Sequence, residues 1–428
     1  MRSCRADGSV AGAQIAINSA AACHAARYTD PVSQKTPLPV SLYLHVPFCT
    51  VKCAYCDFNS YAGMEDSIPS WEAALRDELR RWSSHVAGRP VPTVFIGGGT
   101  PSLLPSESID RIMQTIHELF LLSPDAEVTM EANPESVSLD RLRAYRESGV
   151  NRLSLGVQSL DAAELVFLDR IHSADRAEEA FGAARQAGFD NVSLDLIFDL
   201  PGQSSPSWER TLERVIAWQP DHLSCYSLIV EEGTPLALQV AARRVAEPDP
   251  DLVAELAAET EQRLGANNFE QYEISNYARE DTDGGKECRH NLVYWTHGEY
   301  IGAGPGAHGF VDGIRYSVER SPLRYARLLS GPDGQHGLPT PAAVSAEQIT
   351  PEIAALDTFI MGMRLNAGID TETFARRYPT AWDGFQEALA WGQRESLIVR
   401  AQGRLRLTTR GRRLANELFV RIMEPSLV

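Results

Sequence analysis

The feature that most restricts the fold of this chain is a regular alternation of short β-rich runs with amphipathic helical stretches, which begins at residue 41. Such alternation indicates parallel strands joined by crossover helices. Between the β-rich runs, apolar residues recur at spacings of three and four, which predicts helices that pack one face on the sheet. The six strand-like runs are SLYLHV from Ser41, TVFIGG from Thr93, EVTMEAN from Glu127, RLSLGVQS from Arg152, NVSLDLIF from Asn191 and HLSCYSLI from His222.

Six such units are too few for a closed eight-stranded barrel, so the predicted fold class is α/β, a partial (β/α)6 TIM-like barrel. In barrels of this kind the functional residues gather at the carboxyl ends of the strands. The chemically notable residues lie mostly there. They are a cysteine-rich loop after the first run, GGGT after the second, Glu131 near the end of the third and Gln158 at the end of the fourth, with Asp195 inside the fifth. We therefore expect one site at this rim.

Composition narrows the class of protein further. The chain has 428 residues and a formal net charge of −17 at pH 7, which argues against a chain-wide contact with nucleic acid. No run of eighteen apolar residues predicts a transmembrane segment. The seven cysteines are an odd number in a long chain, unlike the disulfide framework of a small secreted domain, so we expect a reducing, cytoplasmic compartment.

Shifts in composition divide the chain into five parts. Residues 1–36, rich in Ala, Ser and Arg, are expected to form a disordered tail or to reflect an over-long start, with a transit peptide as the alternative. Residues 37–235 carry the barrel pattern, and 236–329 form an extension with the motif RHNLVYW. A Pro/Gly/Ser-rich stretch at 330–345 predicts a linker, and 346–428 predict a small α+β domain of winged-helix-like type.

The motif CTVKCAYCDF places Cys49, Cys53 and Cys56 in a C-x3-C-x2-C arrangement. A structural zinc site needs four ligands, and His45 is a candidate for the fourth. Three thiolates also suit a 4Fe-4S cluster in which the fourth iron stays open for another ligand. The spacing alone leaves both alternatives open, and the first of them would make the protein a zinc-stabilised interaction protein.

Several longer motifs accompany the cysteines: YLHVPFCTVKCAYCDF, GGGTPSLL, EANPES, GVQSLD, DLIFDLPGQS and HNLVYW. Together they make residues 40 to 420 resemble the radical S-adenosylmethionine superfamily, in particular its coproporphyrinogen dehydrogenase-like branch and the heme chaperones within that branch. The resemblance implies a 4Fe-4S cluster on Cys49, Cys53 and Cys56. In that superfamily the open iron binds S-adenosylmethionine, and an electron from the cluster cleaves the cofactor to a 5′-deoxyadenosyl radical.

The same resemblance implies a set of residues around S-adenosylmethionine. Glycine suits such a place because a missing Cβ lets the backbone approach a ligand, and arginine pairs with a carboxylate in a fixed fork. The plainer alternatives are a strand-ending turn for GGGTP and salt-bridged or capping roles for the charged residues. The implied cofactor residues are Tyr43, Tyr55, Gly98, Gly99, Thr100, Glu131, Gln158, Arg170 and Asp195.

The heme assignment depends on the motif HNLVYW. Its His290, Asn291, Tyr294 and Trp295 match the H-N-x-x-Y-W of the heme chaperone branch, which implies His290 as an axial heme ligand. The alternative is a hydrogen-bonded packing histidine next to aromatic residues. Cys288 is a second candidate for heme attachment, although the chain has no C-x-x-C-H motif.

The residue at position 58 distinguishes the heme chaperones from the coproporphyrinogen dehydrogenase of the same branch. The coproporphyrinogen dehydrogenase itself resembles C-x3-C-x2-C-x-C, whereas this chain has Phe58 at the last position, as the heme chaperones do. The resemblance therefore implies a protein that binds heme and passes it to an acceptor hemoprotein, such as a membrane-associated respiratory enzyme. The alternative is an oxygen-independent coproporphyrinogen III dehydrogenase that decarboxylates its substrate by radical chemistry.

Overall fold

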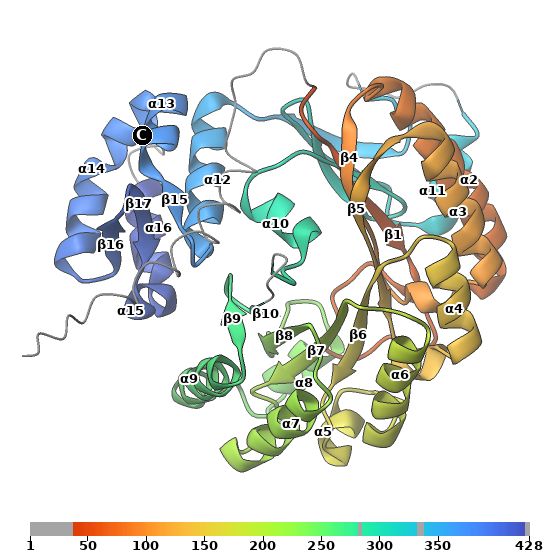
Figure 1. Ribbon diagram of the computed structural model, residues 1–428, viewed down its shortest axis with the longest axis horizontal. Helices are drawn as coiled ribbons and strands as arrows, with labels where there is room; N and C mark the ends of the chain where they lie inside the picture. Colours follow the sequence, from red (N-terminus) through yellow and green to blue (C-terminus); the bar gives the residue numbers. More distant parts are fainter. Residues whose placement is uncertain (1–36, 281–284, 332–337, 424–428) are drawn as a thin grey trace, which may run out of the picture.

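The computed structural model describes residues 37–280, 285–331 and 338–423, and the predicted tail 1–36 lies outside the described residues. Their centre is a twelve-stranded sheet in the order β14-β13-β12-β11-β1-β4-β5-β6-β7-β8-β10-β9. The sheet curves, and its concave side faces helix α10 and the C-terminal part of the chain (Figure 1). This curved, open sheet provides the rim on which the candidate site is built.

All six predicted strands are present, and they lie side by side in chain order as parallel neighbours. They are β1 (Ser41–Val46), β4 (Pro90–Gly98), β5 (Leu121–Ala132), β6 (Arg152–Gln158), β7 (Val192–Phe198) and β8 (His222–Ser227). Between them run the helices α2 (Ile68–His85), α3 (Ser106–Leu119), α4 (Leu139–Glu147), α5 (Ala162–Phe167), α6 (Ala174–Gln186) and α7 (Ser205–Ala217). The prediction of a parallel α/β fold is therefore confirmed.

Further strands extend this parallel sheet at both edges. β11 (Tyr300–Ala303) pairs in parallel with β1, and it is followed by antiparallel β12 (His308–Val311), β13 (Ile314–Val318) and β14 (Ala343–Gln348). At the other edge, β10 (Asn276–Arg279) and β9 (Phe269–Gln271) are antiparallel to their neighbours. The remaining elements of this half are β2 (Phe48–Cys49), β3 (Tyr61–Ala62), α8 (Pro235–Ala241), α9 (Pro250–Ala266), α10 (Arg289–Trp295) and α11 (Pro322–Leu329).

Alternation along the parallel strands separates an apolar face from a polar one. Side chains such as Leu42, Ile96 and Leu155 are fully buried in the core together with Trp71 and Trp82 of α2. The alternate positions on the same strands carry polar side chains, because successive residues of a strand point to opposite faces. On the concave side these polar residues include Thr93, Glu127, Thr129, Arg152, Ser154, Ser193, His222 and Ser224, all of them buried.

The predicted linker at 330–345 is partly built into the fold. Its last residues, from Ala343, belong to strand β14, and Thr340 is fully buried, where its hydroxyl donates to Glu78 of α2 at 2.6 Å. Residues 332–337 lie outside the described part. The stretch is thus anchored where the structure describes it.

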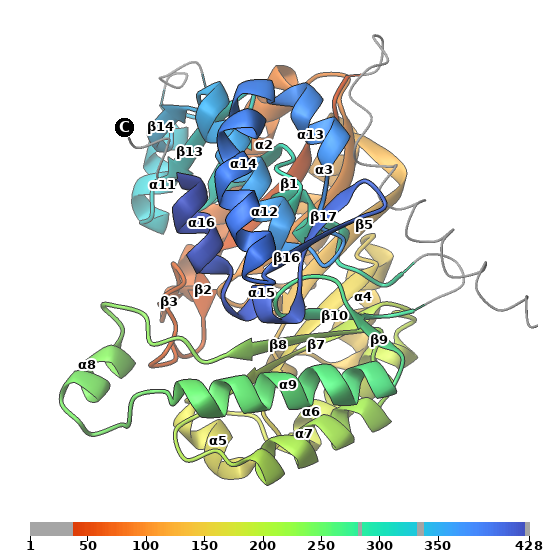
Figure 2. The ribbon, with the colours of Figure 1, turned by 90° about the vertical axis from the view of Figure 1, so that its left-hand side faces the viewer.

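The C-terminal part has its own apolar core around Phe359, Phe374, Phe385 and Leu389. Its three strands pair in the order β15-β17-β16, next to a group of helices (Figure 2). This combination of helices and a small sheet agrees with the predicted α+β domain. The elements are α12 (Pro351–Arg364), β15 (Ile369–Asp370), α13 (Thr371–Arg377), α14 (Pro379–Arg394), β16 (Ile398–Ala401), β17 (Arg404–Leu407), α15 (Thr409–Arg413) and α16 (Ala415–Met423).

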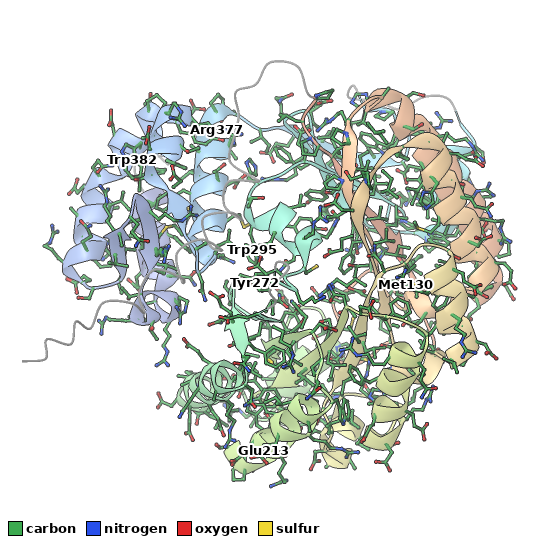
Figure 3. The ribbon with its side chains drawn as sticks, in the orientation of Figure 1. Met130, Glu213, Tyr272, Trp295, Arg377 and Trp382 are labelled. Carbon is green, nitrogen blue, oxygen red and sulfur yellow. The ribbon has the colours of Figure 1, made fainter. Side chains whose placement is uncertain are left out.

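Polar contacts hold this C-terminal part against the open side of the sheet. Arg412 pairs with Glu261 of α9 at 2.6 Å, and the Asn366 N–H donates to the Tyr272 carbonyl at 2.9 Å. Thr358 of α12 hydrogen-bonds His297 at 3.1 Å, just after α10. Tyr272 and Trp295 lie in this region between the sheet and the C-terminal part (Figure 3). In the part of the chain that the structure describes, no helix has the length and apolarity needed to cross a membrane.

Candidate functional site

The cysteine-rich loop follows β1 and is held from two sides. Cys49 ends strand β2 and is buried, whereas Cys53 and Cys56 are half-buried and joined by a turn in which the Cys56 N–H donates to the Cys53 carbonyl at 3.1 Å. Asp169 Oδ2 accepts from the Ala54 N–H at 2.9 Å. The Ala54 carbonyl accepts from the Leu236 N–H at 2.9 Å. Helix α8, which contains Leu236, lies at the edge of the molecule (Figure 2). These contacts fix the loop at the rim of the sheet.

A chain of hydrogen bonds connects the strand ends to one of the thiols. Arg170 Nη2 donates to Asn133 Oδ1 at 2.8 Å and to the Gly156 carbonyl at 2.5 Å. Asn133 Nδ2 donates to Thr100 Oγ1 at 3.3 Å, and the Thr100 hydroxyl donates to Cys49 Sγ at 3.5 Å. The fold thus brings together residues from the carboxyl ends of three neighbouring strands, which is where the sequence analysis expected the site to lie.

The donors around the thiols fit thiolates. Burial raises the pKa of Cys53, and the charge and hydrogen bond of Arg170 oppose that rise. Burial also raises the pKa of Cys56, a backbone hydrogen bond at Phe58 opposes that rise, and the charges of Cys53 and Cys49 add to it. Thiols that receive O–H and guanidinium donors suit an iron-sulfur cluster, because such donors stabilise sulfur in its anionic form.

His45 is not available as a fourth ligand of a zinc ion. Its Nδ1 shares a hydrogen bond with the Tyr43 hydroxyl at 2.9 Å, and its Nε2 lies 2.9 Å from the Asn59 carbonyl. Among the described residues, no three His, Cys, Asp or Glu side chains are grouped so as to hold a metal ion. The two hydrogen bonds of His45 count against the zinc site for which it was the candidate fourth ligand.

The glycine run at the end of β4 is required by close packing. At Gly98, whose φ is +115°, an added Cβ would lie 2.6 Å from the His45 ring, and at Gly99 it would lie 2.5 Å from the Phe48 carbonyl oxygen. The Gly98 N–H donates to Glu131 Oε2 at 2.9 Å. The missing side chains therefore let β4 approach the start of the cysteine-rich loop. The binding of cofactor at Gly98, Gly99 and Thr100 stays a prediction.

Two carboxyl groups lie inside the curved sheet below this rim. Burial raises the pKa of Glu131 to about 8, and the charge of Asp195 adds to the rise. Burial likewise raises the pKa of Asp195, which accepts from the Ser154 hydroxyl at 3.0 Å. Both groups hold their protons more tightly than free carboxyls do, so both are suited to hydrogen bonding with a polar ligand.

Replacement of Glu131 by glutamine should remove a pH dependence of stability. Above its ordinary pKa of 4.5, Glu131 is ionised in the unfolded chain and protonated in the folded one until about pH 8, so stability falls as the pH rises in this window. Between pH 6 and pH 7.5 the loss amounts to about 2 kcal/mol for one proton. Urea unfolding at several pH values should show this decline in the wild type and a weaker one in Glu131→Gln. Equal slopes would contradict the raised pKa.

The other implied cofactor residues lie at the same rim. Tyr55, in the cysteine-rich loop, packs against an apolar cluster that includes Leu168 and Leu228, and burial raises its pKa. Gln158 ends β6 with a left-handed backbone, φ +66°. Such a conformation is strained for a residue with a side chain and often marks a functional site. The roles of these residues toward the cofactor stay predictions.

His290 lies within the concave side of the sheet and is buried. Its Nδ1 is 2.8 Å from Thr93 Oγ1, and its Nε2 is 2.9 Å from the Tyr294 hydroxyl. Its backbone N–H donates to Glu127 at 3.0 Å, and its ring stacks on Phe95 with centroids 5.2 Å apart. Burial, and then the charge of Arg152, lower its pKa to about 3. Because both ring nitrogens have partners, the structure favours the packing role over that of a heme ligand.

Sequence reasoning missed three residues of the rim, namely Asn133, Glu135 and Asp169. Asn133 links Arg170 to Thr100, and Asp169 holds the cysteine-rich loop. Glu135 and His172 form a pair in which Oε2 and Nδ1 are 3.3 Å apart. Asn133 and Glu135 lie inside the quoted motif EANPES, and the charged pair Asp169 and Arg170 was a signal that could have found Asp169.

Comparisons with known proteins agree with this arrangement. The model of the Radical SAM superfamily matches residues 43–215, and that of the HemN C-terminal domain matches 349–414. The heme chaperone HemW of Mycobacterium tuberculosis is 39% identical over 381 residues, which cover 88% of this chain and 93% of that protein. HemW of Bacillus subtilis is 35% identical, with 89% and 98% covered. The structure of coproporphyrinogen III oxidase (HemN) from Escherichia coli superimposes with a TM-score of 0.76 at 23% identity, with 91% of each chain covered, so it shows the fold.

Proposed function

Because the chain belongs to the Radical SAM superfamily and, within it, to the family of the heme chaperone HemW, we propose that it binds heme and transfers it to an acceptor hemoprotein. The observation that carries this proposal is the likeness to two HemW proteins over nearly their whole length, through both the radical SAM part and the C-terminal part. Phe58, in place of the fourth cysteine of the dehydrogenase, supports a carrier over an enzyme.

The proposed cofactors are a 4Fe-4S cluster and S-adenosylmethionine. Cys49, Cys53 and Cys56 would hold the cluster, and when bound it supplies single electrons at the rim of the sheet. Arg170, next to Cys53, would hold the carboxylate of S-adenosylmethionine, since a guanidinium pairs well with a carboxylate. Glu131 and Asp195 offer hydrogen-bonding groups to the rest of the cofactor.

The proposed acceptor is a membrane-associated hemoprotein such as a respiratory enzyme, and the proposed compartment is the cytoplasm. Support for the compartment comes from the cysteines: the five that the structure describes are all free thiols. Free thiols are typical of a reducing environment.

An anaerobic heme titration of cluster-reconstituted protein tests the proposal. We expect saturable, stoichiometric binding that is visible as a shift of the heme absorbance. Incubation with reductant, S-adenosylmethionine and coproporphyrinogen should yield no protoporphyrinogen. If the heme absorbance does not change in the titration, the carrier function is refuted. Turnover of coproporphyrinogen would favour the dehydrogenase alternative.

Two variants test whether His290 binds the heme iron. Tyr294→Phe removes the hydroxyl group next to Nε2 and so frees this nitrogen, whereas His290→Ala removes the imidazole. Because the ring is buried and bonded on both sides, we expect the spectrum of the heme complex to be unchanged in both variants. A spectrum altered by His290→Ala, together with tighter heme binding by Tyr294→Phe, would instead identify His290 as the axial ligand.

A further inference from the structure

A cleft of about 330 Å³ lies where the edge of the large sheet meets the C-terminal part. Its walls are helix α9, strands β9 and β10, the turn after α12, and helix α15. This volume falls in the range of roughly 300 to 1,000 Å³ that is typical of small-molecule sites. The cleft contains none of the residues that the family resemblance implies for the cluster, for S-adenosylmethionine or for heme, so it needs a separate explanation.

Tyr277 of β10 supplies an unpaired hydroxyl group to this cleft. The residue is only 5% exposed. Its hydroxyl has no hydrogen-bond partner in the part of the chain that the structure describes, yet it is not closed off from solvent. Burial raises the pKa of Tyr277, and among the smaller contributions Glu261 adds to the rise and Arg412 opposes it. Because both of these residues line the cleft, the hydroxyl points into it.

Two amide oxygens lie next to this hydroxyl. Gln271 is directly opposite Tyr277 in the antiparallel pair of β9 and β10, so the two side chains share a face with Cβ atoms about 5 Å apart. Gln271 Nε2 donates to the Ile274 carbonyl at 2.8 Å, and Asn366 Nδ2 donates to the Gln271 carbonyl. A carbonyl only accepts, so the oxygen of each amide is its free end. Among the described residues, both oxygens are buried without a hydrogen-bond partner.

The charges around the cleft favour a cation. Glu261 and Glu270 both line it, whereas Arg412 is the single basic residue among the lining residues that the structure describes. Arg412 Nη2 donates to Glu261 Oε1 at 2.6 Å, so this guanidinium already has an anionic partner. One negative charge is left over at the cleft, and it attracts a cation and repels an anion.

Three acceptor oxygens in one cleft match the three N–H donors of an ammonium group. A buried acceptor without a donor costs free energy, and a ligand that brings the donor removes this cost. We propose that the cleft binds a small alkylammonium compound, whose ammonium group donates to Tyr277, Gln271 and Asn366. Because Asn366 belongs to the C-terminal part and the other two to the large sheet, the ligand would join the two parts. The inference does not depend on heme transfer.

Calorimetric titration with putrescine, a four-carbon diamine, tests the proposal when the wild type is compared with Gly265→Leu. Gly265 of α9 lines the cleft, and a Cβ added there meets no atom within 4 Å, so a leucine fills open space. We expect putrescine to bind at least tenfold more weakly to this variant. Gly182→Leu in α6 is the matched control, because a Cβ there also meets nothing and Gly182 is not in the cleft lining. It should keep the wild-type affinity.

These two variants also separate the cleft from the general attraction of a diamine to a chain with a net charge of −17, because neither substitution changes the charge. Equal putrescine binding by the wild type and Gly265→Leu would therefore overturn the inference. If Gly265→Leu does not fold, Tyr277→Phe decides in its place. Tyr277→Phe removes one acceptor and should weaken putrescine about three- to tenfold, and an unchanged affinity would count against the site.

Analogues of the ligand test its chemistry on the wild type. Butanediol has the same length without the charge, and tetramethylammonium has the charge without an N–H donor. Both should bind at least tenfold more weakly than putrescine, and equal binding of either would overturn the ammonium contact. Acetyl-lysine amide carries the same ammonium group on a protein side chain. Tighter binding of this compound than of putrescine would identify a lysine of a partner protein as the source of the ammonium group, and the site itself would stand.

Discussion

The triple variant Cys49→Ala, Cys53→Ala, Cys56→Ala should contain almost no iron or acid-labile sulfide after reconstitution, whereas the wild type should contain about four irons per chain. Binding of S-adenosylmethionine should fall at least a hundredfold with it, because the open iron that chelates the cofactor is lost. Iron analysis, absorbance and equilibrium dialysis measure these losses. Among the variants proposed here, this one should cause the largest loss of cluster and of cofactor binding.

The variant should still fold, because the loop lies at the rim and outside the main apolar core. Cys53 and Cys56 are half-buried, and none of the three cysteines belongs to that core. Cys225→Ala is the matched control, since Cys225 lies in β8 within the core, 3% exposed. It should lower stability by about 1 kcal/mol and keep the cluster. Retention of iron by the triple variant would show that the cluster has other ligands.

Glu78→Ala should destabilise the protein by about 3 to 5 kcal/mol, the largest loss of stability we expect from one substitution. Glu78 lies in α2 and is fully buried. Its carboxylate accepts from the Tyr325 hydroxyl at 2.6 Å, the Thr340 hydroxyl at 2.6 Å and the Gly304 N–H at 2.9 Å. Alanine would leave these donors buried and unpaired in three different segments, and it would also leave a cavity.

Urea unfolding followed by circular dichroism measures this loss. Asp77→Ala serves as the control on the same helix, because Asp77 is exposed and pairs with Arg80 of the same helix. We expect that substitution to cost less than about 0.5 kcal/mol. A Glu78→Ala protein as stable as the control would mean that α11 and the segment around Thr340 are held by their apolar contacts alone.

The parallel half of the fold was predictable because its signals are local. Each of the six strands is a short β-rich run between helical stretches, and the side of each residue follows from the alternation along one strand. Strands β9 to β14 escaped prediction because they are short, and each needs a partner strand to form. Strand β14, for example, begins inside a Pro/Gly-rich stretch and is defined by its pairing with β13.

In the candidate site, too, features set by neighbouring residues were predictable, whereas contacts between residues far apart in the chain were not. The spacing of Cys49, Cys53 and Cys56 is a property of eight consecutive residues, so the spacing indicated a metal-binding loop, and the resemblance to a known superfamily implied the 4Fe-4S cluster. The surroundings of His290 were not predictable, because its partner Thr93 lies 197 positions away in the chain. The same holds for Asp169, whose contact to Ala54 spans 115 positions.

The amino-acid sequence by itself determined the alternation of strands and helices, the placement of the candidate site residues at the carboxyl ends of the strands, and the three thiols of one loop. Only the tertiary structure decided that His290 is bonded on both ring nitrogens and that Thr340 anchors a supposed linker. It also decided that Tyr277 and Asn366 share a cleft. The physical reason is that periodicity and spacing act between neighbours in the chain, whereas burial and hydrogen-bond partners are set by segments that meet only after folding.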